Sequence, residues 1–107
     1  MSEVNILGTK YKFETGDLNE PNLAENDGIC ELYEKYILIR NPEYMSGQSE
    51  EARQDRYNHV MRHEIIHAIA HECGVYYGDD ESLVDWIAHI IPIVNKAILE
   101  LNIDRLT

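Results

Sequence analysis

The clearest structural signal in the chain is a helical pattern in residues 60–74, which read VMRHEIIHAIAHECG. On a helix of 3.6 residues per turn the apolar residues gather on one side: Val60, Met61, Ala68 and Ile69. An apolar side of this kind is normally covered by other parts of the protein. The segment therefore predicts an amphipathic helix that packs against the rest of the chain.

Capping signals define both ends of this helix. Ser49 or Gln48 can cap a helix that begins near Glu50, because each offers a side-chain oxygen to free backbone N–H groups. Glu50 and Glu51 suit the positive end of the helix dipole. Gly74 is a natural stop, since glycine readily adopts the left-handed conformation that ends many helices. We therefore predict one long helix between these signals.

A second helix is predicted after the loop Gly74–Asp80, with Asp79 or Asp80 as its cap. Its apolar residues recur at intervals of three and four: Val84, Ile87, Ile91, Val94, Ile98 and Leu101. Pro92 lies inside this pattern and is expected to kink the helix or divide it. We expect Trp86 to lie in the core.

The first half of the chain predicts short strands and loops. Val4–Phe13 carries β-branched and aromatic residues and fits one or two strands, whereas the polar segment Asp17–Asp27 predicts a loop. Gly28–Leu32 and Lys35–Arg40 are apolar runs that fit a hairpin, and Asn41-Pro42 ends it. The expected fold is α+β: a small, mostly antiparallel sheet packed on the two helices.

Length and composition limit the possible functions. With 107 residues the chain is expected to form a single domain, residues 1–107. The 20 Asp and Glu residues outnumber 9 Lys and Arg residues, and the net charge of −11 argues against nucleic acid and anionic membranes as partners. Two cysteines, Cys30 and Cys73, are too few for a disulfide framework, and we expect both to be buried thiols. We expect a soluble, cytoplasmic protein.

The first helix contains an HExxH motif, His63-Glu64-Ile65-Ile66-His67. Residues four apart lie above one another on a helix, so both imidazoles can face one ion, and imidazole suits Zn²⁺. Glu64 is turned by about 100° from His63. It therefore lies beside the metal, where it can act as a general base toward a water molecule.

A catalytic zinc site needs a third protein ligand. Glu81 and Asp85 follow His67 by 14 and 18 residues, share a helix face, and are the best candidates: one could bind the metal while the other holds an imidazole N–H. Acidic residues in a first helical turn also suit the helix dipole without any metal. His71 is a rival ligand, but each step of four residues drifts by about 40° around the helix. His59 and His71 are more simply explained as ordinary helix residues.

These residues resemble the zincin metallopeptidases of the gluzincin kind, in which HExxH is followed by Glu-x-x-x-Asp on a second helix. The resemblance is closest to small HExxH proteins of phages and prophages of Gram-positive bacteria. It is carried by RHEIIHA at residues 62–68 and ESLVDWIA at residues 81–88, with the strand region Gly28-Ile29-Cys30 and Lys35–Ile39. It covers residues 28–95.

The resemblance implies a role for each residue of the motif. His63, His67 and Glu81 would be the zinc ligands and Glu64 the general base. Asp85 would orient a ligand histidine from the second shell. The implied activity is zinc-dependent hydrolysis of a peptide or protein substrate.

In zincins an edge strand beside the active-site helix aligns an extended peptide, and Lys35–Arg40 is our candidate for this strand. Tyr76 or Tyr77 could stabilise the oxyanion. The alternative function is non-enzymatic: a zinc-stabilised phage or prophage protein that binds a host or phage regulator.

Overall fold

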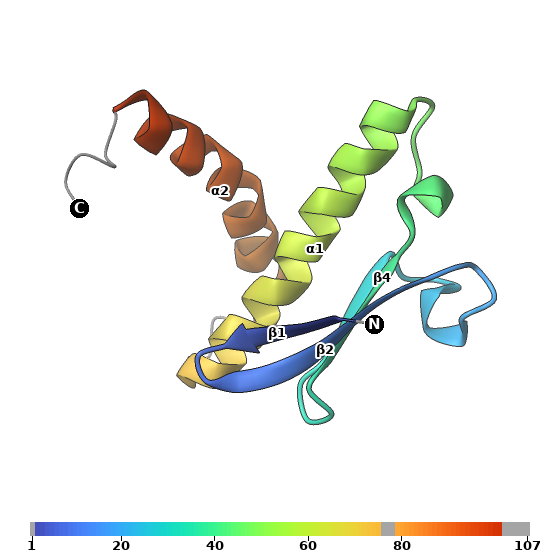
Figure 1. The fold of residues 1–107 in the computed structure, drawn as a ribbon, viewed down its shortest axis with the longest axis horizontal. Coiled ribbons are helices and arrows are strands. Elements are labelled where there is room, and N and C mark those ends of the chain that lie inside the picture. The colour runs from blue at the N-terminus through green and yellow to red at the C-terminus, as the bar shows by residue number, and fades with distance from the viewer. Residues whose placement is uncertain (1, 76–78, 102–107) are drawn as a thin grey trace.

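The first half of the chain forms one four-stranded sheet in the computed structural model, which describes residues 2–75 and 79–101 (Figure 1). The strands are β1 (Ser2–Ile6), β2 (Thr9–Gly16), β3 (Gly28–Glu31) and β4 (Tyr36–Arg40). Their order in the sheet is β1-β2-β4-β3, and a parallel β2–β4 pair lies between two antiparallel hairpins. The predicted α+β fold with a mostly antiparallel sheet is confirmed.

Local sequence explains both hairpins. Leu7 and Gly8 have φ values of 53° and 91°, as a tight two-residue turn requires, and the Gly8 N–H donates to the Asn5 side chain at 2.8 Å. This turn divides the apolar run at residues 4–13 into β1 and β2, one of the two predicted outcomes. In the second hairpin Lys35 has a φ of 56° just before β4. The predicted loop at residues 17–27 contains one short 3-10 helix, Pro21–Leu23.

Two helices follow, and their ends agree with the capping signals. Helix α1 spans Glu50–Cys73: the Ser49 hydroxyl accepts the Ala52 N–H, and Gly74 ends the helix with a φ of 71°. Helix α2 spans Glu81–Glu100, and the Asp80 carboxylate accepts the Leu83 N–H. Pro92 lies within α2, which continues through it undivided.

Helix α1 lies between the sheet and α2 (Figure 1). The core forms where α1 covers the sheet, and its buried members are Ile6, Tyr11, Ile37, Ile39, Met45 and Ala68. Helix α2 packs against α1 through Val84 and Ala88, which are fully buried or nearly so. The described residues thus form a compact unit of the kind expected for a soluble protein.

The remainder of α2 extends away from this core (Figure 1). Trp86 is 58% exposed, so the expectation that it lies in the core is wrong. Ile69 and Cys73 on α1 are also exposed, contrary to expectation, and Cys30 is only partly buried. By length and composition alone α2 is apolar enough to cross a membrane, although its first turns pack against α1.

A carboxylate near the end of α1 fixes this helix to the sheet. Glu72 accepts hydrogen bonds from the hydroxyls of Thr9 and Tyr11 in β2, at 2.8 and 2.7 Å, and from Lys35 Nζ at 2.8 Å. The bonds from Lys35, Tyr11 and Thr9, in that order, lower the pKa of Glu72 to about 2. Since His67 lies just over one turn before Glu72, this contact also fixes the part of α1 that carries the HExxH motif.

Candidate metal centre

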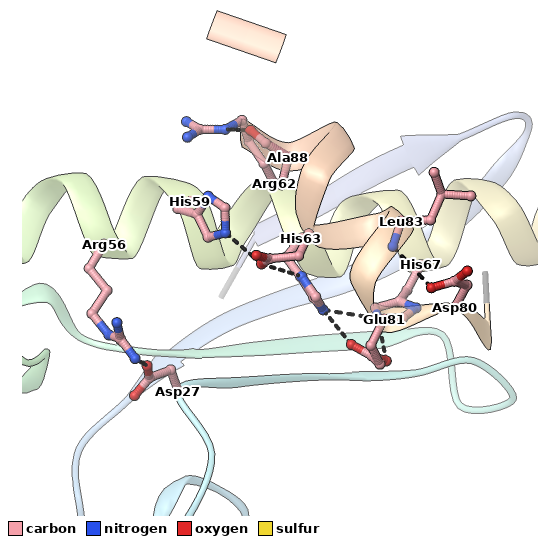
Figure 2. A network of polar contacts seen from close by, with 11 residues as sticks. Asp27, Arg56, His59, Arg62, His63, His67, Asp80, Glu81, Leu83 and Ala88 are labelled. Atoms are coloured by element: carbon pink, nitrogen blue, oxygen red, sulfur yellow. Dashed lines mark hydrogen bonds and ion pairs between the residues drawn. The ribbon is translucent and has the colours of Figure 1, made fainter. Parts of the chain in front are cut away.

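Helices α1 and α2 bring together the three residues predicted as metal ligands. His63 and His67 lie one turn apart on α1, with their Nε2 atoms 3.1 Å apart. Glu81, the first residue of α2, places one oxygen 2.9 Å from His63 Nε2 and the other 3.0 Å from His67 Nε2 (Figure 2). The candidate ligand atoms all lie within 4.8 Å of one another.

The spacing of these atoms fits a small tetrahedral cation. Zinc bonds of about 2.0–2.1 Å give a tetrahedron with edges of about 3.3–3.4 Å. The imidazole nitrogens are 3.1 Å apart, and each lies 2.9 or 3.0 Å from a different oxygen of Glu81. For either oxygen, two of the three separations are therefore shorter than such an edge by a few tenths of an ångström. Zinc geometry would need a small outward movement of the two imidazoles and a rotation of the exposed Glu81 carboxylate that brings one oxygen within reach of both.

Hydrogen-bond chemistry at His63 also favours a cation. Its Nδ1 atom lies 3.3 Å from Asp85 Oδ1, and its Nε2 atom lies 2.9 Å from Glu81 Oε2. An ionised carboxylate only accepts hydrogen bonds, whereas a neutral imidazole has a single N–H. One ring N–H therefore cannot serve two ionised carboxylates, and a second ring proton or a cation between Nε2 and Glu81 would satisfy both sides of the ring. A metal at Nε2 would leave the Nδ1 proton for Asp85, an arrangement common around metal-bound histidines.

His59 joins the site through Asp85. Its Nε2 atom lies 2.7 Å from the same Asp85 oxygen that faces His63. The hydrogen bond from His59, followed by that from His63, lowers the pKa of the Asp85 carboxyl. We expected His59 to be an ordinary helix residue. His59 lies four residues before His63 and therefore on the same face of α1, the face that contacts Asp85. This spacing is the signal that could have identified it.

Glu64 lies beside the cluster and is almost completely buried, with 8% of its surface exposed. Burial raises the pKa of its carboxyl; His63 and His67 oppose this rise, and the charge of Glu81 adds to it. A carboxyl with a raised pKa exchanges protons nearer to neutral pH than an ordinary glutamate does. Glu64 is thus a buried carboxyl that lies directly beside the candidate ligands.

A cavity of about 540 Å³ opens over the cluster. Its walls come from the loop before β3, from the start of β3, from α1 and from α2: Asn26, Asp27, Gly28, Arg56, His59, Val60, His63, Glu64, His67, Glu81 and Asp85. A second hollow of about 380 Å³ is lined by Ile29, Cys30, Leu32, Glu64, His67, Asp79 and Glu81. Glu64, His67 and Glu81 line both hollows. The two hollows therefore adjoin, and together they run along β3 from Gly28 past the candidate ligands.

The edge strand beside the site is β3, and the expectation that it is Lys35–Arg40 is wrong. That segment contains β4, which pairs with β2 on one side and β3 on the other. An interior strand has no free backbone groups to offer a peptide. In contrast, β3 lies at the edge of the sheet and lines both hollows.

Gly28 allows α1 to approach this strand closely. A Cβ atom at residue 28 would lie 2.7 Å from Val60 Cγ1, 2.9 Å from Ile39 Cδ1 and 3.3 Å from Glu64 Cγ. A larger residue would therefore push the helix, and Glu64 with it, away from β3. Glycine at residue 28 therefore sets the distance between α1 and β3 at the site.

Other predicted residues lie outside the cluster. His71 packs edge-to-face against the Tyr33 ring, with centroids 5.7 Å apart, and does not belong to the convergent group. Tyr76 and Tyr77 lie outside the described residues. At the opposite end of the larger cavity, Asp27 accepts from Arg56 Nε at 2.8 Å (Figure 2). Asp27 also pairs with Arg40.

Comparisons with known proteins returned no match among family models, curated proteins or solved structures. Support for a function therefore comes from the geometry of the site.

Proposed function

We propose that the chain is a zinc-dependent metallopeptidase-like protein that hydrolyses peptide bonds in a peptide or protein substrate. The observation that carries this proposal is the convergence of His63, His67 and Glu81 beside the buried carboxyl of Glu64. Two imidazoles and one carboxylate are a ligand set used by catalytic zinc, which keeps a fourth position open.

Each residue has a defined task in this proposal. Zinc bound to the three ligands would polarise the scissile carbonyl and make the attacking water more acidic. Glu64 accepts a proton from that water and transfers it to the leaving amine. Asp85 holds the His63 ring in the orientation that aims Nε2 at the ion.

The position of β3 supports an extended peptide as the substrate. A peptide that pairs with this edge would pass along the two hollows and over the ligands. Main-chain hydrogen bonds to a sheet edge give affinity, while pockets for alternate side chains give specificity. Substrate selection would then depend on side chains of residues 26–32.

The test compares the parent chain with Glu64→Gln and His67→Ala. We expect elemental analysis to find about one zinc per parent chain, the same content in Glu64→Gln, and much less in His67→Ala. Cleavage of a mixed library of quenched fluorogenic peptides should fall by at least about 100-fold in Glu64→Gln. Cleavage that persists in Glu64→Gln, or a parent chain that does not retain zinc, would overturn the proposal.

The alternative is a non-catalytic zinc-stabilised phage or prophage protein that binds a host or phage regulator. It is favoured by one observation, the exposure of large apolar side chains along α2, among them Trp86, Ile93 and Leu99. A biological effect that survives Glu64→Gln but not a polar substitution at these positions would support it.

We place either function in the cytoplasm. Cys30 and Cys73 are free thiols, as is usual in a reducing compartment. The net charge of −11 supports a protein partner over nucleic acid or an anionic membrane.

A further inference from the structure

An arginine of α1 contacts the backbone of α2 near the candidate metal centre. Arg62 Nε donates a hydrogen bond to the carbonyl oxygen of Ala88 at 2.9 Å (Figure 2). Arg62 immediately precedes the ligand His63, and Ala88 is fully buried where the two helices meet. The bond therefore joins the two helices at the level of the site.

Pro92 explains why this carbonyl needs a donor from outside its own helix. In an α-helix the carbonyl of residue 88 accepts from the N–H of residue 92. Proline has no N–H, so Pro92 cannot provide this bond. A buried carbonyl without a partner is costly, and Arg62 supplies the missing donor.

The location of Ala88 gives this bond a consequence for the site. Ala88 follows Asp85 by three residues and Glu81 by seven, so all three lie on one face of α2. Among the described residues, α2 packs mainly on α1 and much of its length is exposed. A displacement of α2 at Ala88 would therefore move Glu81 and Asp85 away from the histidines.

We propose that Arg62 is a positioning residue. By donating a hydrogen bond to the Ala88 carbonyl, which Pro92 leaves without a helical donor, it holds Glu81 and Asp85 against His63 and His67. Without this donor, water must reach the Ala88 carbonyl, and α2 must shift to admit it. The effect on metal binding rests on the proposed zinc site. The hydrogen bond from Arg62 to the Ala88 carbonyl, which Pro92 leaves without a helical donor, does not depend on that site.

The pairing is tested in the metal-free protein with four chains: the parent, Arg62→Met, Pro92→Ala and the double variant. Arg62→Met should lower the Tm of the parent by about 4–8 °C, because the carbonyl loses its donor. Alanine at position 92 restores the helical N–H, so the same substitution should lower the Tm by less than half as much in that background. Equal shifts in both backgrounds would overturn the proposal. This cycle needs no zinc, so it remains decisive even if the proposed function fails.

The positioning role is tested by metal affinity in the same four chains. Arg62→Met should weaken zinc binding about tenfold, measured by competition with a chromophoric chelator, and should change the visible spectrum of the Co²⁺-loaded protein. The double variant should recover affinity to within about threefold of Pro92→Ala. Arg53→Met is the matched control, since Arg53 also donates to a backbone carbonyl, that of Gly47, at the far end of α1. Unchanged affinity in Arg62→Met, no recovery in the double variant, or an equal loss in Arg53→Met would overturn it.

Discussion

His63 and Asp85 are joined through the ring nitrogen that does not face Glu81 and His67, with Nδ1 3.3 Å from Oδ1. The same carboxylate oxygen lies 2.7 Å from His59 Nε2. Asp85 therefore bridges two histidines of α1 from the second turn of α2, and it fixes which nitrogen of His63 faces Glu81. The bridge makes the ligand geometry depend on the packing of the two helices.

Replacing Asp85 should weaken metal binding without removing a ligand. In Asp85→Ala the His63 ring loses the acceptor that orients it, and zinc affinity should fall by about 10–100-fold, measured by chelator competition. His71→Ala is the control: His71 packs on Tyr33 away from the ligands, so its replacement should leave affinity unchanged. Comparable losses in both variants would contradict the role of Asp85.

Gly28 should be intolerant of even the smallest side chain. In Gly28→Ala the new methyl group meets Val60, Ile39 and Glu64, and we expect a loss of about 1–3 kcal/mol in the free energy of unfolding, measured by urea denaturation. Because Val60 Cγ1 is the nearest atom, at 2.7 Å, Val60→Ala should recover part of this loss in the double variant. Additive losses would show that the close approach of α1 to β3 is not what requires glycine.

The sequence predicts well the features that depend on residues close together in the chain. Ser49, Gly74 and Asp80 mark helix ends through their own side chains or backbone, and the structure places each as expected. The His63–His67 pair and the Glu81–Asp85 pair follow from the four-residue repeat of a helix. Contact between the two pairs requires one further condition, that α2 returns beside α1.

Features that depend on distant pairing are not predictable in this way. The parallel pairing of β2 with β4 joins segments more than 20 residues apart, and it makes β4 an interior strand and β3 the edge. Periodicity shows that α2 has an apolar side, but it does not show how far another element covers that side. For this reason the prediction that Trp86 lies in the core is wrong.

The contacts of Glu72 should give the protein a pH-dependent stability. Its pKa is lowered from 4.5 to about 2 in the folded state, so the ionised form stabilises the fold. This contribution is complete above pH 4.5 and disappears as the pH falls toward 2. Glu72→Gln should therefore lower the Tm by several degrees at pH 7, and the difference from the parent should shrink steadily below pH 4.5.

Thermal scans of both chains between pH 7 and pH 2 measure this difference. Glu34→Gln provides the control, because Glu34 is exposed in the β3–β4 turn and should change the Tm by less than about 1 °C. A difference between the parent and Glu72→Gln that stays constant down to pH 2 would show that the carboxylate acts through its shape and not through its charge.

The two cysteines should differ strongly in reactivity. Burial, followed by the negative charges of Glu64 and Glu31, raises the pKa of Cys30 to about 12, whereas Cys73 is exposed at the end of α1. The thiolate is the reactive form, and at pH 8 a pKa of about 12 leaves only about one Cys30 in 10⁴ ionised. With a disulfide reagent such as DTNB we expect one fast thiol and one at least about 100-fold slower.

Cys73→Ser should remove the fast phase, and guanidinium should make Cys30 fast in that variant. A fast thiol in folded Cys73→Ser would contradict the raised pKa that partial burial beside Glu64 and Glu31 gives Cys30.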